Sequence, residues 1–180
     1  MATKSEMTDR LLLVGMMATG KTTIGQLCAK RLGWPFLDSD AQLWADTGRT
    51  AQEIFDAEGD DALRSWESRV LVEAIAHPTP VVIAVAGGVV LSAKSRALLV
   101  DSGVVVWLRA SITTLSERVE RGGARPRLGS DPSRALRDLY LTRHPLYAAV
   151  ATFVIDVDDL APDEVATRIL AETGLGDATR

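Results

Sequence analysis

The chain has 180 residues, 47% hydrophobic and 24% charged, so it is long enough for one globular domain with a full core. Its formal net charge of −4 argues against a nucleic-acid partner, because such domains usually carry a basic excess. The one cysteine, Cys28, excludes an intramolecular disulfide and is expected in the core. The polar N-terminus and the absence of a long apolar run predict neither a signal peptide nor a membrane partner, and we expect a cytoplasmic protein.

A phosphate-binding loop is predicted near the N-terminus. An apolar run at 11–14 precedes residues 15–22, GMMATGKT, which fit the pattern G-x-x-x-x-G-K-[ST], and a helix is predicted to follow and to end at Gly33. In this arrangement backbone N–H groups point at one small volume and favour a polyphosphate. We expect Lys21 to reach the β- and γ-phosphates and the Thr22 hydroxyl to bind Mg²⁺. The alternative is a glycine-rich turn with one exposed lysine.

Two acidic residues follow the next predicted strand, a short buried one at 34–37. Asp38 and Asp40 would lie at its carboxyl end, where ligands bind in open α/β sheets. The simpler interpretation is a helix start, because Asp is a favourable N-cap, and both interpretations can hold together. After that helix, a capping box opens another that ends at Gly59, and a longer one is predicted over 61–76.

Two further groups are candidates for ligand contacts. Arg64 and Glu67 are three residues apart on the longer helix, which lets the carboxylate orient the guanidinium. Most such pairs are solvated, and taken alone this one favours that interpretation. A β-branched run at 81–85, typical of a central parallel strand, leads to Gly87 and Gly88. These glycines indicate a backbone that a ligand approaches closely, with a plain turn as the alternative.

Strands and helices alternate along the rest of the chain, with strands predicted at 104–108 and 152–155. The segment 122–132 departs from this order because it contains glycines, prolines and two arginines without an apolar period. We predict a mobile lid that closes over phosphates; the alternative is a disordered surface loop. The helix that resumes at Ser133 is predicted to be interrupted at 143–147.

These motifs, in this order and at this spacing, resemble those of the shikimate kinases, small phosphate-loop enzymes of the nucleoside-monophosphate-kinase fold. The likeness covers Leu11 to about Leu170. The six matching motifs are the phosphate loop at 15–22, Asp38-Ser39-Asp40, Arg64-Ser65-Trp66-Glu67, Ala86-Gly87-Gly88, Arg125-Pro126 and Arg143-His144-Pro145-Leu146-Tyr147. Together they are far more specific than any one of them, so solvated roles for Arg64 and Arg143 become the minority interpretation.

The resemblance implies a three-layer α/β/α fold with a central parallel five-stranded sheet. The chain would form a single domain over residues 1–180, with its core at about 10–38 and 78–173. A small helical substrate-binding segment would cover about 39–77 and the mobile lid about 122–132.

The resemblance also implies that the protein transfers the γ-phosphoryl group of ATP to a ring hydroxyl of shikimate, a carboxylated trihydroxy cyclohexene, with Mg²⁺. We expect a monomer. The catalytic residues would be Lys21, Asp40 and Arg125. ATP would contact Gly15, Ala18, Thr19, Gly20, Lys21, Thr22, Thr23, Arg125 and Pro162, with Arg118 or Arg121 beside the adenine. Shikimate would contact Asp40, Arg64, Gly87, Gly88 and Arg143, and Mg²⁺ would be held by Thr22 and, through water, by Asp38.

The residue types suit these roles. Arg64 and Arg143 would hold the substrate carboxylate with planar donor forks that a lysine lacks. Asp40 would bind the hydroxyls and orient or deprotonate the attacking one, and Arg125 would bring positive charge over the transferred group.

The sequence departs from the family at four positions. Alanines stand at Ala18 and Ala86 where glycine is usual, Leu63 replaces a phenylalanine, and Arg127 replaces an apolar lid residue. No charged catalytic group is lost, but the two alanines add methyl groups near the ligands. Two alternatives therefore stay open: a divergent paralogue that phosphorylates another cyclitol or sugar acid, and a nucleotide-binding homologue without turnover.

Overall fold

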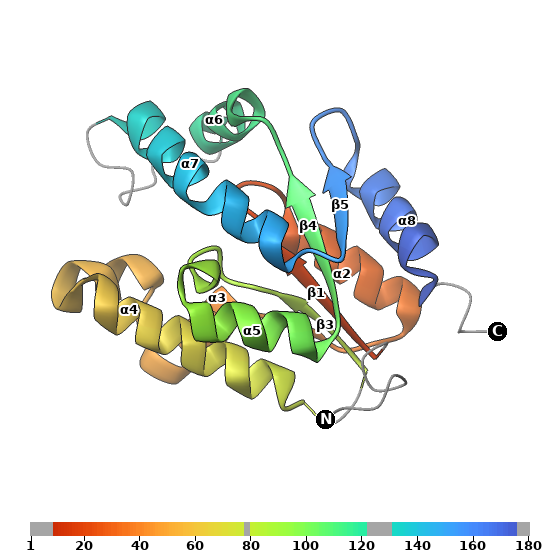
Figure 1. The fold of residues 1–180 in the computed structure, drawn as a ribbon, viewed down its shortest axis with the longest axis horizontal. Helices are drawn as coiled ribbons and strands as arrows, with labels where there is room; N and C mark the ends of the chain where they lie inside the picture. The colour runs from red at the N-terminus through yellow and green to blue at the C-terminus, as the bar shows by residue number, and fades with distance from the viewer. Residues whose placement is uncertain (1–8, 78–79, 122–130, 176–180) are drawn as a thin grey trace.

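The computed structural model describes residues 9–77, 80–121 and 131–175 and is built on a five-stranded sheet (Figure 1). The strand order is β2-β3-β1-β4-β5, and every pairing is parallel. The strands are β1 (Arg10–Val14), β2 (Phe36–Asp38), β3 (Val81–Ala84), β4 (Val104–Arg109) and β5 (Phe153–Asp156). The predicted α/β fold with a parallel five-stranded sheet is confirmed.

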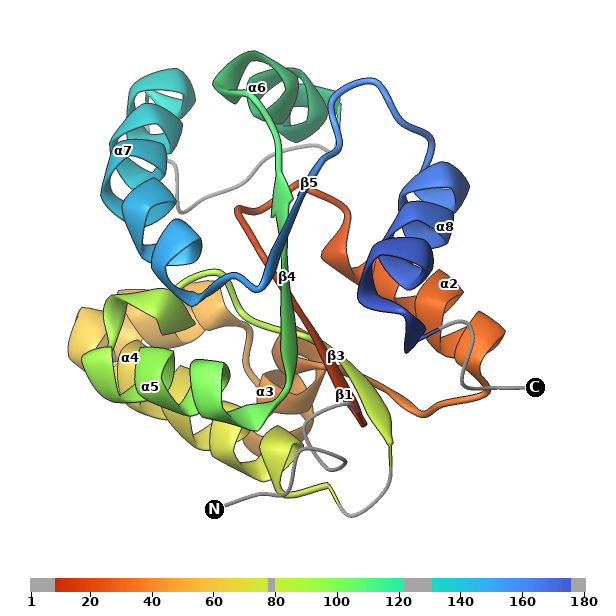
Figure 2. The ribbon, with the colours of Figure 1, turned by 45° about the vertical axis from the view of Figure 1, so that its right-hand side comes forward.

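Helices cover both faces of this sheet and complete three layers. They are α2 (Lys21–Leu32), α3 (Ser39–Thr47), α4 (Ala51–Ile75), α5 (Ala93–Ser102), α6 (Ile112–Arg121), α7 (Pro132–Val150) and α8 (Pro162–Thr173), with a short 3₁₀ helix η1 (Val89–Leu91) before α5. Helices α2 and α8 lie together on one side, and α5 and α7 on the other (Figure 2). Among the described helices, none has the length and apolar character needed to cross a membrane.

The strand order positions the predicted site. Strands β1 and β3 lie inside the sheet, and their side chains are buried over Leu11–Val14 and Val81–Ala84, because a parallel sheet covered on both faces has no solvent side. Since β2, β3 and β1 are neighbours and run in the same direction, the segments that follow them meet at one edge of the sheet. These segments are the phosphate loop, the Asp38–Asp40 turn and the glycine pair. Cys28 is buried beneath them in α2, as expected.

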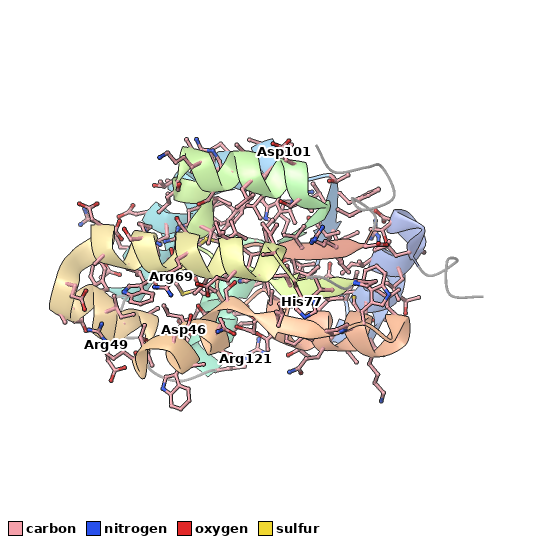
Figure 3. The ribbon with its side chains drawn as sticks, turned by 90° about the horizontal axis from the view of Figure 1, so that it is seen from below. Asp46, Arg49, Arg69, His77, Asp101 and Arg121 are labelled. Atoms are coloured by element: carbon pink, nitrogen blue, oxygen red, sulfur yellow. The ribbon has the colours of Figure 1, made fainter. Side chains whose placement is uncertain are left out.

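Helices α3 and α4 form a second, smaller hydrophobic cluster of Leu43, Ile54, Leu63 and Val70. The predicted capping box at Thr50 is present, and the backbone of α4 leaves the helical conformation at Gly59, where the sequence predicts a break. The charged side chains of Asp46, Arg49 and Arg69 belong to these two helices and to the turn between them (Figure 3).

Two predicted boundaries are wrong. Strand β2 begins at Phe36 and is only half-buried, because it is an edge strand of the sheet. Helix α7 is not interrupted at 143–147 but continues through Pro145 to Val150. Proline removes one helical hydrogen bond, yet Arg143 and Tyr147 on either side of it are buried, so packing along that face maintains the helix.

The predicted lid lies largely outside the described residues. Its segment 122–130, with Arg125 and Arg127, is not described, whereas α6 before it and α7 after it are.

Candidate active site

The phosphate loop joins β1 to α2 and has a backbone that requires glycine at two points. Gly15 has φ 146° and Gly20 has φ 92°, values that L side chains rarely adopt. A Cβ atom at Gly15 would also lie 2.6 Å from the Leu108 carbonyl oxygen. Gly20 has no side chain to cap α2, so the first N–H groups of the helix face the loop interior, an arrangement that favours an anion.

Ala18 is the non-glycine residue with positive φ in the described part of the chain, at 65°. Its carbonyl oxygen accepts a hydrogen bond from Arg118 Nη1 at 3.4 Å, and Arg118 Nη2 donates to the Val157 carbonyl at 2.8 Å. Arg121, the other candidate beside the adenine, is exposed and pairs with Glu117 (Figure 3). Arg118 is therefore the arginine of α6 that lies against the phosphate loop.

Lys21 lies over the loop. Its Nζ donates to the carbonyl oxygens of Gly15 and Met16, at 3.0 Å each. Beside it is a cleft of about 240 Å³, lined by residues 17–18 and 20–23 together with Asp38, Asp40, Ala84 and Val85. The predicted lysine, hydroxyl and carboxylates thus share one cleft.

Asp38 combines the two roles that the sequence left open. Its Oδ1 accepts from the backbone N–H of Asp40 at 2.9 Å and of Ala41 at 3.3 Å, which caps α3. Its Oδ2 accepts the Thr22 hydroxyl at 2.6 Å. The N-cap holds one carboxylate oxygen in place and leaves the other beside the Thr22 hydroxyl.

Arg64 is held between two carboxylates. Its Nη1 pairs with Glu67 Oε2, while Nη2 and Nε donate to Asp60 Oδ1 at 2.8 Å and Oδ2 at 3.3 Å. The Arg64 side chain is 16% exposed and that of Glu67 4%, so the solvated interpretation of this pair is wrong. Burial lowers the pKa of the Arg64 guanidinium, but Asp60 and Glu67 more than offset this and raise its pKa above the ordinary value.

The glycine pair after β3 lies against both predicted arginines. A Cβ atom at Gly88 would collide with Arg64 Nη1 and stand 2.5 Å from Glu67 Oε2. A Cβ atom at Gly87 would stand 3.4 Å from Arg143 Nη1. The segment does turn into η1, but it is more than a plain turn, because the guanidinium of Arg64 occupies the space that a side chain would fill.

Arg143 is buried at 4% exposure, and its Nε has no hydrogen-bond partner among the described residues. Tyr147, one turn further along α7, is fully buried and donates its hydroxyl to the Gly87 carbonyl at 2.8 Å. Burial raises the pKa of Tyr147 to about 12, so the hydroxyl stays protonated. A buried guanidinium with an unsatisfied N–H is costly unless an anion completes it.

The structure thus brings the predicted residues together in two adjacent groups. The loop residues, Asp38 and Asp40 form the cleft, whereas Arg64, Arg143 and the glycine pair form a cluster next to it. The two groups touch where a Cβ atom at Gly87 would come within 3.3 Å of the Gly15 carbonyl oxygen.

The remaining residues predicted to contact ATP are Thr19, Thr23 and Pro162, and they lie in different surroundings. Thr19 is buried and donates its hydroxyl to the Met16 carbonyl at 2.9 Å, so its side chain stabilises the loop. Thr23 lines the cleft, and Pro162 is the exposed first residue of α8.

Sequence reasoning missed Asp60, which the spacing of four residues to Arg64 after a helix-breaking glycine could have revealed.

Comparisons with protein families and with solved structures agree on one family. The family model described as shikimate kinase matches residues 17–173. The chain belongs to the shikimate kinase family. Similar family members include the shikimate kinases of Symbiobacterium thermophilum, 42% identical over 89% of this chain and 93% of that protein, and of Ruegeria pomeroyi, 38% identical over 89% and 83%.

Solved structures give the same result for the fold of this shikimate kinase family member. A shikimate kinase from Acinetobacter baumannii, in complex with shikimate, superimposes with a TM-score of 0.87 at 37% identity, covering 93% of each chain. A gluconokinase from Sinorhizobium meliloti has a TM-score of 0.68 at 23% identity over 97% of this chain and 95% of its own, and shares the fold. The resemblance inferred from the six motifs is confirmed.

Proposed function

We propose that this shikimate kinase family member transfers the γ-phosphoryl group of ATP to a ring hydroxyl of shikimate, giving shikimate 3-phosphate. The observation that carries the proposal is the pair of guanidinium groups, the buried Arg143 and the part-buried Arg64, that lie against one glycine turn beside a phosphate-binding loop. They come from helices far apart in the sequence, and a carboxylate ligand bound by both would explain why each position is an arginine.

The unsatisfied Nε of Arg143 supports an anionic ligand at this position. The backbone of Gly87 and Gly88 comes close enough to offer N–H groups to the same ligand. The relative from A. baumannii was solved in complex with shikimate and is similar over 93% of this chain, which supports shikimate as that ligand. All these groups belong to one chain, so we expect a monomer to be sufficient.

The cleft beside the phosphate loop would hold the nucleotide. The N-terminus of α2 and Lys21 suit the phosphates of ATP, and Arg118 and Pro162 would lie toward the adenine. The Thr22 hydroxyl and Asp38 Oδ2, 2.6 Å apart, are the hard oxygen donors that Mg²⁺ prefers. Bound there with ATP, Mg²⁺ would neutralise charge on the phosphates.

Asp40 would act on the attacking hydroxyl. It lies in the first turn of α3 and lines the cleft beside the phosphate loop. The hydroxyl oxygen forms a bond to the γ-phosphorus, the bond to the bridging oxygen breaks, ADP leaves, and the hydroxyl proton passes to the Asp40 carboxylate. Arg125, outside the described residues, stays the predicted source of further positive charge.

The test replaces each arginine by lysine. Arg64→Lys and Arg143→Lys keep the charge but lose the planar fork, so each should weaken shikimate binding roughly tenfold to a hundredfold. ATP binding should be nearly unchanged. Trp66, half-buried two residues from Arg64, provides a fluorescence signal for the titration.

Arg168→Lys is the matched control, because Arg168 is exposed on α8, pairs there with Glu172 and lies on a different helix from the Trp66 reporter. An analogue with a carboxamide in place of the carboxylate should bind more weakly, and the two active-site substitutions should then cost little more. If both variants bind shikimate as tightly as the unaltered protein, or if the unaltered protein does not bind it, another substrate must be assigned.

A further inference from the structure

The donors of Arg64 are divided between two protein partners and a remaining free edge. A guanidinium carries five N–H groups in a fixed planar arrangement. Asp60 accepts from Nε and from one N–H of Nη2, and Glu67 accepts from one N–H of Nη1. One N–H on each Nη atom is left for a ligand, and the end-on edge of the guanidinium, which carries one N–H of each Nη atom, is the edge at which a planar carboxylate would bind both.

The two carboxylates have different effects on the guanidinium. Glu67 contacts Nη1 of the guanidinium from the buried side. Asp60, 53% exposed, makes two contacts from the solvent side and therefore fixes the plane of the group. The two N–H groups at the end of the Arg64 guanidinium then point in one fixed direction.

The backbone places Asp60 for this task. Gly59 has φ 86° and ψ −177°, a region that is essentially restricted to glycine, and it interrupts α4 immediately before Asp60. A regular helical segment starts at Asp60, so that this residue lies one turn before Arg64 on the same face, with Glu67 on the other side of the guanidinium.

We propose that Asp60 is a positioning residue: by occupying the Nε edge of Arg64 it directs the end-on N–H pair at the substrate carboxylate. The inference rests on the proposed function, in which Arg64 binds that carboxylate. A negative charge this close to an anion site also repels the substrate. If repulsion dominated, removing the Asp60 charge would lower the KM for shikimate, whereas positioning predicts that the KM rises.

The test is Asp60→Asn, which removes the charge and one acceptor but keeps a residue that is equally favourable at a helix start. We expect the KM for shikimate to rise about threefold to tenfold, with kcat and the KM for ATP nearly unchanged. Asp60→Glu, which retains a carboxylate, should restore part of the affinity. Asp61→Asn is the matched control, since it removes the same charge from the exposed neighbouring position and should not raise the KM.

A carboxamide analogue of shikimate separates positioning from a folding defect. Asp60→Asn should penalise the carboxylate substrate and spare the analogue, whereas an equal loss for both ligands would contradict positioning. A KM for shikimate that stays the same or falls would also overturn it. If Arg64→Lys raises the KM for shikimate while Asp60→Asn does not, the positioning role of Asp60 is wrong but the proposed carboxylate site stands. If neither substitution raises the KM, Arg64 does not bind the carboxylate and the proposed site is wrong.

Discussion

The Tyr147 hydroxyl donates a hydrogen bond to the Gly87 carbonyl oxygen at 2.8 Å, which ties α7 to the turn after β3. The same tyrosine is one helical turn from Arg143 and contacts Trp107 of β4 with ring centroids 5.9 Å apart. One buried side chain thus links the second predicted arginine, the glycine pair and the central sheet. The arrangement fixes the turn that the substrate would approach.

Tyr147→Phe removes this bond and keeps the ring. The free energy of unfolding should fall by about 1 kcal/mol, because a part-buried carbonyl loses its donor. The KM for shikimate should rise up to about tenfold, and the KM for ATP should stay constant. Urea unfolding and steady-state kinetics measure these effects. Tyr140→Phe, at a half-buried position of the same helix, is the control, and equal effects from both would remove any special role for Tyr147.

Gly88→Ala should reduce shikimate binding without unfolding the protein. The φ of Gly88 is −82°, which alanine adopts freely, so the cost arises only from the collision with Arg64 Nη1. Because Asp60 and Glu67 hold that guanidinium, it cannot move aside without losing them. We expect the KM for shikimate to increase more than about tenfold, and the melting temperature to fall, because the displaced guanidinium loses its ion pair with the buried Glu67 carboxylate. Normal kinetics in this variant would mean that Arg64 does not need its observed position.

Ala18→Gly should stabilise the protein. The left-handed conformation of Ala18, φ 65°, costs about 1–2 kcal/mol for a residue with a Cβ, and glycine relieves this at a smaller entropic cost in the unfolded chain. The free energy of unfolding should rise by up to about 1 kcal/mol in urea titrations. The KM for ATP should not increase, since the loop keeps its N–H groups. A destabilised variant would show that the Ala18 methyl group makes contacts worth more than the backbone strain.

Cys28 should make folding less favourable at high pH. Burial raises the pKa of its thiol from 9.0 to about 12, so between these values the unfolded chain loses this proton while the folded chain keeps it. Stability from this group is complete below pH 9 and is lost as the pH rises toward 12, at up to about 1.4 kcal/mol per pH unit.

The measurement compares urea unfolding of the unaltered protein and of Cys28→Ala at pH 8 and pH 10. The difference between the two proteins removes the effect of all other titrating groups. The unaltered protein should lose more stability than the variant over this interval. Parallel losses would show that the thiol ionises normally in the folded state.

The local pattern of the chain was sufficient for the fold and for much of the site. The loop at 15–22 between an apolar run and a helix, the capping box at Thr50 and the break at Gly59 all depend on neighbouring residues, and each is found as predicted. The burial of β1 and β3 follows from their continuous apolar sequence. These features are local, so a single sequence contains the information for them.

Tertiary packing decided the rest. Whether Arg64 is solvated depends on Gly88, a residue on another element, and whether α7 continues past Pro145 depends on the burial of Arg143 and Tyr147. Such contacts join residues distant in sequence, and their energy is set by what surrounds them rather than by the spacing along the chain. The sequence by itself determined which residues are candidates for binding phosphate and carboxylate; only the folded arrangement decided which of them lie together and which of their donors are taken by protein partners.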